Sequence, residues 1–133
     1  MSCRFLSRRA LELLHDESLA EHGGLPGLRD EGLLESALAR LHQLLAYGQH
    51  DVAALAAAYG FALIRNHAFA DGNKRAAFLA TGLFLGLNGH RLVTTQVDAT
   101  LTIFSLAAGD LSEDEFAHWL RSHIQPRQAN TRP

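Results

Sequence analysis

The sequence has only one cysteine, Cys3, so it can form neither a disulfide within the chain nor a zinc site built from several cysteines. It also lacks an excess of basic residues: 12 Lys and Arg stand against 14 Asp and Glu, which excludes a domain-wide positive surface for nucleic acid. No apolar run reaches the roughly 18 residues that a membrane span needs, and the first residues have no signal-peptide core. We therefore expect a cytoplasmic protein that binds neither a membrane nor nucleic acid directly.

Residues that favour β-strands are scarce as well. Val, Ile and Thr together number 12, whereas the helix-favouring Leu and Ala number 45. A chain of 133 residues is long enough for one core and too short for two domains. We therefore expect an all-α fold, a compact bundle of about six helices in a single domain over residues 1–124. Residues 125–133 contain two prolines and no apolar face, and they are expected to form a disordered tail.

The spacing of apolar residues and the capping residues indicate where the helices lie. Six helices are expected, at residues 5–21, from 31 through at least 45, at 51–66, 73–88, 97–109 and 112–123. The third and fourth are apolar on nearly every side, which predicts that they form the centre of the bundle. The sixth begins with a capping box, Ser112 to Glu115. The apolar positions of the fifth recur at helical spacing, at Val97, Leu101, Phe104 and Ala108.

A polar segment, residues 65–75, lies between these two central helices. If the helix after it begins near Asn73, its first backbone N–H groups point into the loop, and the helix dipole favours an anion there. Gly72 permits a phosphate to approach the backbone closely. Lys74, the only lysine of the chain, and Arg75 place two positive charges on the same turn. Because cations at a helix N-terminus oppose the dipole, a bound anion would offset that cost.

Two further side chains of this segment suit group transfer. His67 can act as a base, because an imidazole can accept a proton from a hydroxyl group near neutral pH. Asp71 can help to hold Mg²⁺ on a nucleotide, because this ion often takes only one or two protein carboxylates. Each residue alone is more often a cap or a solvated side chain, and Phe69 is expected to pack the loop onto the core. Together, between two buried helices, they predict phosphoryl or nucleotidyl transfer.

The segment His67-Ala-Phe69-Ala-Asp71-Gly72-Asn73-Lys74-Arg75 resembles the signature of the Fic/Doc family, His-x-Phe-x-Asp/Glu/Asn-Gly/Ala-Asn-Gly/Lys-Arg. It is most similar to the Doc (death-on-curing) branch. The residues before it also resemble Doc-type toxins, at Gly23-Gly24 and from Gly27 to Arg40. The resemblance covers roughly residues 10–110.

The resemblance implies an all-helical fold in which His67 activates a protein hydroxyl and Asp71 assists Mg²⁺. It also implies that Gly72 and the turn from Asn73 to Arg75 bind the phosphates of ATP. Position 74 is Lys where adenylylating members have Gly, and in Doc-like proteins this Lys accompanies transfer of the γ-phosphate. The implied activity is a protein kinase that modifies a threonine of the translation factor EF-Tu and arrests translation. Gly72 itself is a small departure toward the adenylylating pattern, since typical Doc sequences have Ala there.

Control of the activity is expected to come from a second protein. Self-inhibited Fic proteins carry a Ser/Thr-x-x-x-Glu-Gly/Asn helix, but the only Glu-Gly pair here, Glu31-Gly32, has Gly27 at the Ser/Thr position. The resemblance therefore implies a Phd-like antitoxin that folds on binding, within a toxin–antitoxin operon. Two other functions stay open at this point: transfer of a nucleotidyl (AMP) group to a protein hydroxyl, and a catalytically silent corepressor that acts only through its antitoxin.

Overall fold

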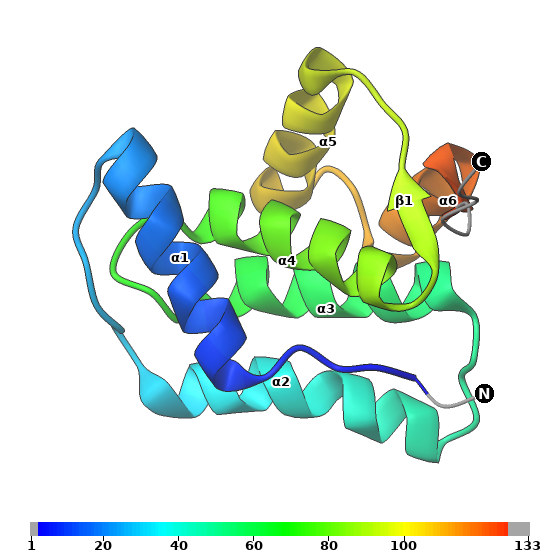
Figure 1. The fold of residues 1–133 in the computed structure, drawn as a ribbon, viewed down its shortest axis with the longest axis horizontal. Helices are drawn as coiled ribbons and strands as arrows, with labels where there is room; N and C mark the ends of the chain where they lie inside the picture. Colours follow the sequence, from blue (N-terminus) through cyan, green and yellow to red (C-terminus); the bar gives the residue numbers. More distant parts are fainter. Residues whose placement is uncertain (1–2, 128–133) are drawn as a thin grey trace, which may run out of the picture.

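The computed structural model describes residues 3–127, which form six α-helices and two short β-strands (Figure 1). The all-α fold class predicted from composition is confirmed. The elements in chain order are α1 (Arg8–His22), α2 (Glu31–Ala46), α3 (Val52–Asn66), α4 (Asn73–Leu87), β1 (His90–Leu92), α5 (Gln96–Ala108), α6 (Glu113–His123) and β2 (Ile124–Pro126).

The centre of the bundle is the pair α3 and α4, which lie side by side (Figure 1). Nine of the fifteen residues of α3 are buried, most of them alanines and large apolar residues. Because the helix is surrounded by the core, it needs no polar face. The two helices are in close contact at Gly60, where an added Cβ would lie 2.4 Å from the Oγ1 of Thr81. Only a glycine fits at that distance.

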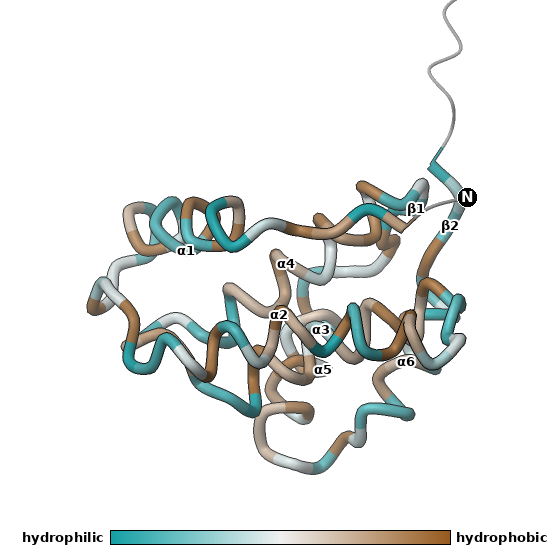
Figure 2. The backbone as a smooth tube through the Cα atoms, turned by 90° about the horizontal axis from the view of Figure 1, so that it is seen from below, coloured by the Kyte–Doolittle hydropathy of each residue, from teal (hydrophilic) through white to brown (hydrophobic). Residues whose placement is uncertain are grey.

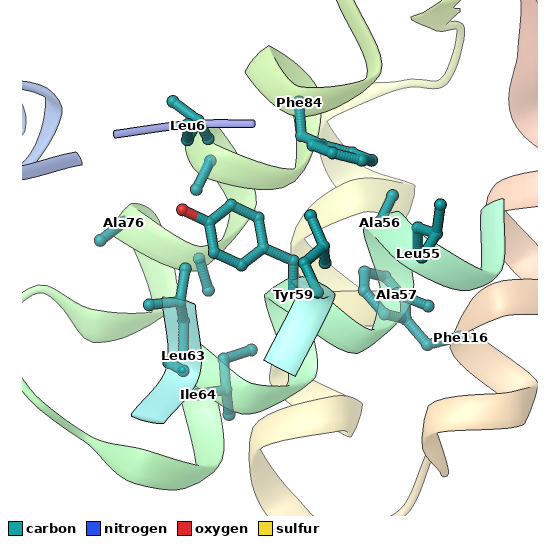
Figure 3. Close-up of a cluster of buried hydrophobic side chains, with 14 of the residues drawn as sticks. Leu6, Leu55, Ala56, Ala57, Tyr59, Leu63, Ile64, Ala76, Phe84 and Phe116 are labelled. Atoms are coloured by element: carbon teal, nitrogen blue, oxygen red, sulfur yellow. The ribbon is translucent and has the colours of Figure 1, made fainter. Parts of the chain in front are cut away.

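Tyr59 occupies the middle of this core, between Leu63, Phe84 and Leu6 (Figure 3). Its ring meets that of Phe84 edge to face, with 6.1 Å between the centroids. Its hydroxyl has no hydrogen-bond partner among the residues described, and burial raises its pKa. The core therefore contains one polar atom that it does not satisfy.

The outer helices begin at residues that sequence reasoning can recognise. The Asp30 side chain accepts the N–H of Leu33 at the start of α2, as expected for an N-cap. At the start of α6, Ser112 and Glu115 form the predicted capping box, which this structure confirms. Hydrophilic and hydrophobic residues alternate along α2, the pattern of a helix with one buried and one solvated face (Figure 2).

Helix α5 buries a different face from the one that carries its large apolar residues. The apolar stripe seen in the sequence points outward: Val97 is 70% exposed, Leu101 62% and Phe104 54%. The buried face of the helix is instead formed by Ala99, Thr102, Ile103 and Leu106. Both sets recur at helical spacing, and the smaller one faces the core because Ala99 and Thr102 allow the helix to approach it.

Both ends of the chain also differ from expectation. The first helix begins at Arg8, three residues later than predicted, because Ser7 caps it by accepting the N–H of Ala10. At the other end, β2 pairs antiparallel with β1, so Gln125 and Pro126 belong to the folded domain and not to a tail. Arg127 is also bound to the domain, since it donates hydrogen bonds to the carbonyls of Gly89 and Gly86. The rest of the predicted tail, residues 128–133, lies outside the described residues. No helix within residues 3–127 is both long and apolar enough to cross a membrane.

Candidate active site

The loop of residues 67–72 joins α3 to α4 and carries half of the predicted site residues, and the other half lie on the first turn of α4. It is held against the segment 27–30 by an antiparallel bridge between Leu28 and Phe69. Phe69 is only 2% exposed, which confirms the prediction that it packs the loop onto the core. The polar residues on either side of it are thereby fixed in place at the surface.

His67 is the residue that ends α3, and it is the only residue besides glycine within 3–127 with a positive φ, at 51°. Its carbonyl accepts a hydrogen bond of 2.7 Å from the Nε of Arg29. A second nitrogen of the same guanidinium, Nη2, donates to the carbonyl of Asn66 at 2.9 Å. Arg29 thus satisfies two C-terminal carbonyls of α3 with a positive charge, which suits the negative end of the helix dipole.

The ring of His67 is exposed and faces Asn73. The side chain of Asn73 makes two hydrogen bonds to the backbone of Phe69: its Oδ1 accepts the N–H at 3.0 Å and its Nδ2 donates to the carbonyl at 2.9 Å. These bonds fix the orientation of the amide and place its Nδ2 3.3 Å from the Nδ1 of His67. Because an amide nitrogen only donates, Nδ1 accepts in this contact, and the proton of the neutral ring lies on Nε2.

Asp71 lies on the opposite side of the loop. Its Oδ1 accepts the N–H of Gly72 at 2.8 Å, and its Oδ2 accepts the N–H of Leu25 at 3.2 Å. These backbone donors, Gly72 first, lower the pKa of the carboxyl group. The segment after α1 can come this close to the Asp71 carboxylate only because residue 24 is a glycine, since a Cβ there would lie 2.9 Å from Oδ2. The carboxylate is exposed and charged, and each oxygen keeps lone-pair capacity for a cation.

The first turn of α4 has the features on which the predicted anion site depends. Gly72 precedes the helix in the left-handed conformation, with a φ of 72°. The backbone N–H groups of residues 73–75 have no hydrogen-bond acceptor within the described part of the chain. Unpaired N–H groups at the positive end of a helix dipole bind phosphate readily. These N–H groups would suit the phosphates of a nucleoside triphosphate, and the exposed Asp71 carboxylate would suit its Mg²⁺.

The two cations of this turn point to different helices. The Nζ of Lys74 lies over the ring of Phe104 on α5, 5.3 Å from its centroid. The guanidinium of Arg75 is turned toward α1: its Nε donates to the Oγ of Ser18 at 3.2 Å and its Nη2 to the carbonyl of Gly23 at 3.1 Å. Both flank the N-terminus of α4, but the structure brings neither into contact with His67.

Sequence reasoning did not assign the contacts that α1 and the segment after it make with the loop. His15 and Ser18 on α1 are both buried, and they reach Asp71 and Arg75 respectively. A signal was present in the sequence, because these two polar residues occupy the core-facing side of α1 together with Leu11 and Leu19. Within residues 3–127, no three His, Cys, Asp or Glu side chains cluster in a way that could hold a metal ion without other ligands.

The sequence model of the Fic/DOC family matches residues 5–85, which include α1 to α3, most of α4 and all the predicted site residues. The chain belongs to this Fic/Doc family. It is 36% identical over 119 residues to the protein kinase doc of Escherichia phage P1, an alignment that covers 89% of this chain and 94% of the relative. It is also 47% identical over 73 residues to the toxin Doc of Mycolicibacterium smegmatis, covering 53% of this chain and 55% of that protein.

Proposed function

We propose that this Fic/Doc protein is a toxin that acts as a protein kinase, transferring the γ-phosphate of ATP to a hydroxyl group of a protein required for translation. One observation carries the proposal. A single short loop places an exposed imidazole at the end of α3 beside unpaired backbone N–H groups at the start of α4. The names of the two relatives, a protein kinase and a toxin, support the same function.

His67 is the proposed general base. The hydroxyl oxygen of the target bonds to the γ-phosphorus, the bond from that phosphorus to the bridging oxygen breaks, and ADP leaves while His67 takes up the hydroxyl proton. Its Nε2 is the nitrogen that a target can reach, since Nδ1 faces Asn73. To act as the base, Nε2 must first lose its proton, so the ring must change to the tautomer with the proton on Nδ1. The 3.3 Å contact between Nδ1 and the Nδ2 of Asn73 must break for this change of tautomer, because both nitrogens would then be donors.

Asp71 and the first turn of α4 are the proposed binding site for ATP and Mg²⁺. The metal, when bound, would neutralise charge that develops on the phosphates. Asp71 is suited to hold it because its carboxylate is exposed, ionised and fixed by two backbone N–H groups. The backbone N–H groups of residues 73–75 would donate hydrogen bonds to phosphate oxygens, and Arg75 adds a charge whose position is fixed by Ser18.

Lys74 is the residue that favours transfer of phosphate over transfer of a nucleotide. A glycine at this place would leave room beside the helix start for an α-phosphate, whereas Lys74 fills that room with a compact positive charge. Its ammonium group is held toward α5 by the ring of Phe104. Nucleotidyl transfer to a protein hydroxyl is the second candidate, because Gly72 follows the pattern of adenylylating members.

A threonine of EF-Tu is the proposed target, and a Phd-like antitoxin is the proposed partner. The structure offers a surface suited to an antitoxin segment that folds on binding. On α4, Leu79, Leu83 and Leu87 form a row that starts one turn after Arg75, and each is more than one-third exposed. The outward face of α5 adds Leu101 and other apolar side chains. An amphipathic helix could cover these apolar residues.

Labelled ATP tests the proposal directly. Purified protein is incubated with EF-Tu and with ATP labelled at either the α- or the γ-phosphate. We expect only the γ-label on EF-Tu. His67→Ala should lower the transfer rate by about 10²- to 10⁴-fold without unfolding the protein, and Arg75→Ala should also weaken nucleotide binding. His118→Ala, which removes an exposed imidazole from α6, is the matched control and should transfer at the wild-type rate.

Other outcomes of the same experiment separate the alternatives. Retention of the α-label on EF-Tu would identify a nucleotidyltransferase. If neither label is retained and expression of His67→Ala arrests growth as strongly as the wild type, the chain is a binding module and the kinase proposal is wrong.

A further inference from the structure

His15 is a buried titratable residue for which the proposed reaction has no use. It lies in the middle of α1, is 1% exposed, and faces the motif loop between Leu11 and Leu19. Burial removes the two ring nitrogens of a histidine from water, which costs free energy, whereas a leucine would fill a similar space without this penalty. The contacts of the ring indicate what the imidazole provides.

The imidazole makes two contacts with the motif loop, on either side of Ala70. Its ring stacks on that of Phe69, with 3.8 Å between centroids and 14° between the planes. Its Nε2 lies 2.7 Å from the backbone carbonyl oxygen of Asp71. Since a carbonyl only accepts, Nε2 carries a proton and donates it. One side chain of α1 thus fixes both a buried ring of the loop and the backbone of the proposed metal ligand.

The ring also lies directly beneath the start of α4. A Cβ added to Gly72 would be 3.5 Å from the Nε2 of His15, so the imidazole borders the residue that precedes the anion-binding turn. The carboxylate of Asp71 is held separately by the N–H groups of Leu25 and Gly72. The backbone carbonyl of Asp71 is held by His15, which is its hydrogen-bond donor among the described residues.

We propose that His15 is a positioning residue for the nucleotide and metal side of the active site. It acts through the backbone of Asp71 and Gly72 and does not touch substrate. The inference rests on the proposed function, because Asp71 and the first turn of α4 must bind Mg²⁺ and ATP for their position to matter. Loss of its N–H donor should weaken the binding of ATP with Mg²⁺ more than it slows the transfer step, since His67 lies on the other side of the loop.

Two substitutions separate the hydrogen bond from the stacking. His15→Gln keeps an N–H donor near the place of Nε2, and His15→Phe keeps a flat ring against Phe69 but has no donor. The affinity for ATP in the presence of Mg²⁺ is measured by calorimetry, and KM and kcat are measured with EF-Tu. We expect His15→Phe to raise Kd and KM by about 10- to 100-fold with a smaller change in kcat, and His15→Gln to restore most of the affinity.

Hydrogen exchange without nucleotide gives a readout that does not depend on activity. The amides of Ala70 and Gly72, which donate to the Gly27 carbonyl and the Asp71 carboxylate, should exchange faster in His15→Phe than in the wild type, while those of α6 stay unchanged. The proposal is overturned if His15→Phe binds ATP as the wild type does, or if His15→Gln is as weak as His15→Phe although both are folded. If His15→Phe does not fold, wild-type affinity in His15→Gln supports the hydrogen bond and weak binding in a folded His15→Gln overturns it.

Failure of the proposed function would look different. If the wild type itself neither binds ATP with Mg²⁺ nor labels EF-Tu, the kinase proposal fails. The exchange of the Ala70 and Gly72 amides in the two variants would still report whether His15 fixes the loop.

Discussion

Replacing Gly60 with alanine tests whether the spacing of the two central helices depends on a single close approach. The new Cβ would lie 2.4 Å from the Oγ1 of Thr81 and 3.2 Å from the Cε2 of Phe116. Thr81 is fully buried and donates its hydroxyl proton to the carbonyl of Ala77 at 2.7 Å. To reach an ordinary contact distance, either α3 and α4 must separate by about 1 Å or Thr81 must rotate and lose that bond.

The expected cost follows from these two routes. Separation of the helices is a form of overpacking, which typically destabilises by about 1–3 kcal/mol. Rotation of Thr81 would instead leave a buried hydroxyl unpaired, which also costs about 1–3 kcal/mol. Alanine recovers about 0.5–1 kcal/mol, because it favours a helix more than glycine does. We therefore expect Gly60→Ala to lower the free energy of unfolding by about 1 kcal/mol. Gly82→Ala is the matched control in α4, where a Cβ meets nothing within 4 Å, and it should stabilise by about 0.5–1 kcal/mol.

Urea unfolding followed by circular dichroism measures both values. A double-mutant cycle with Thr81→Ala identifies the clash, since removal of Oγ1 should make Gly60→Ala less damaging by at least about 0.5 kcal/mol. The reasoning is refuted if Gly60→Ala is as stable as the wild type, or if the effects of Gly60→Ala and Thr81→Ala are additive.

Three further perturbations test other parts of the molecule. Tyr59→Phe removes the buried hydroxyl that has no partner among residues 3–127, so the free energy of unfolding should rise by about 1 kcal/mol. A lower free energy of unfolding, measured in urea, would contradict this. The backbone N–H groups of Gly72 and Leu25, which donate to the Asp71 carboxylate, lower its pKa below the usual 3.8. The stability that these hydrogen bonds give is therefore present above pH 3.8 and is lost as the pH falls through the folded-state pKa. The melting temperature of the wild type should therefore fall more steeply below about pH 4 than that of Asp71→Asn, and parallel curves would exclude the effect. Leu101→Glu places a charge on the exposed face of α5, so co-expressed antitoxin should rescue growth less well while EF-Tu labelling by the toxin alone is unchanged; full rescue would place the antitoxin elsewhere.

The sequence was sufficient for features that depend on neighbouring residues. The capping box at Ser112 and the cap at Asp30 are local hydrogen bonds, and the central position of α3 follows from its lack of a polar face. The face of α5 could not be decided locally, because Leu101 and Ile103 both belong to stripes with helical spacing. Which stripe is buried depends on how closely the neighbouring helices allow α5 to approach. The pairing of β1 with β2 also joins residues more than 30 positions apart, which no local pattern encodes.

The same distinction applies to the site, because the motif supplies the reacting groups but not everything that holds them in place. Asn73 fixes the ring of His67 from within the motif, and its hydrogen bonds span only four to six residues. Asp71 and Arg75, in contrast, are anchored to His15 and Ser18, more than 50 residues earlier in the chain. A change in α1 can therefore shift the nucleotide side of the site while leaving the base in place. Substitutions on α1 should accordingly lower nucleotide affinity more than the rate of proton transfer.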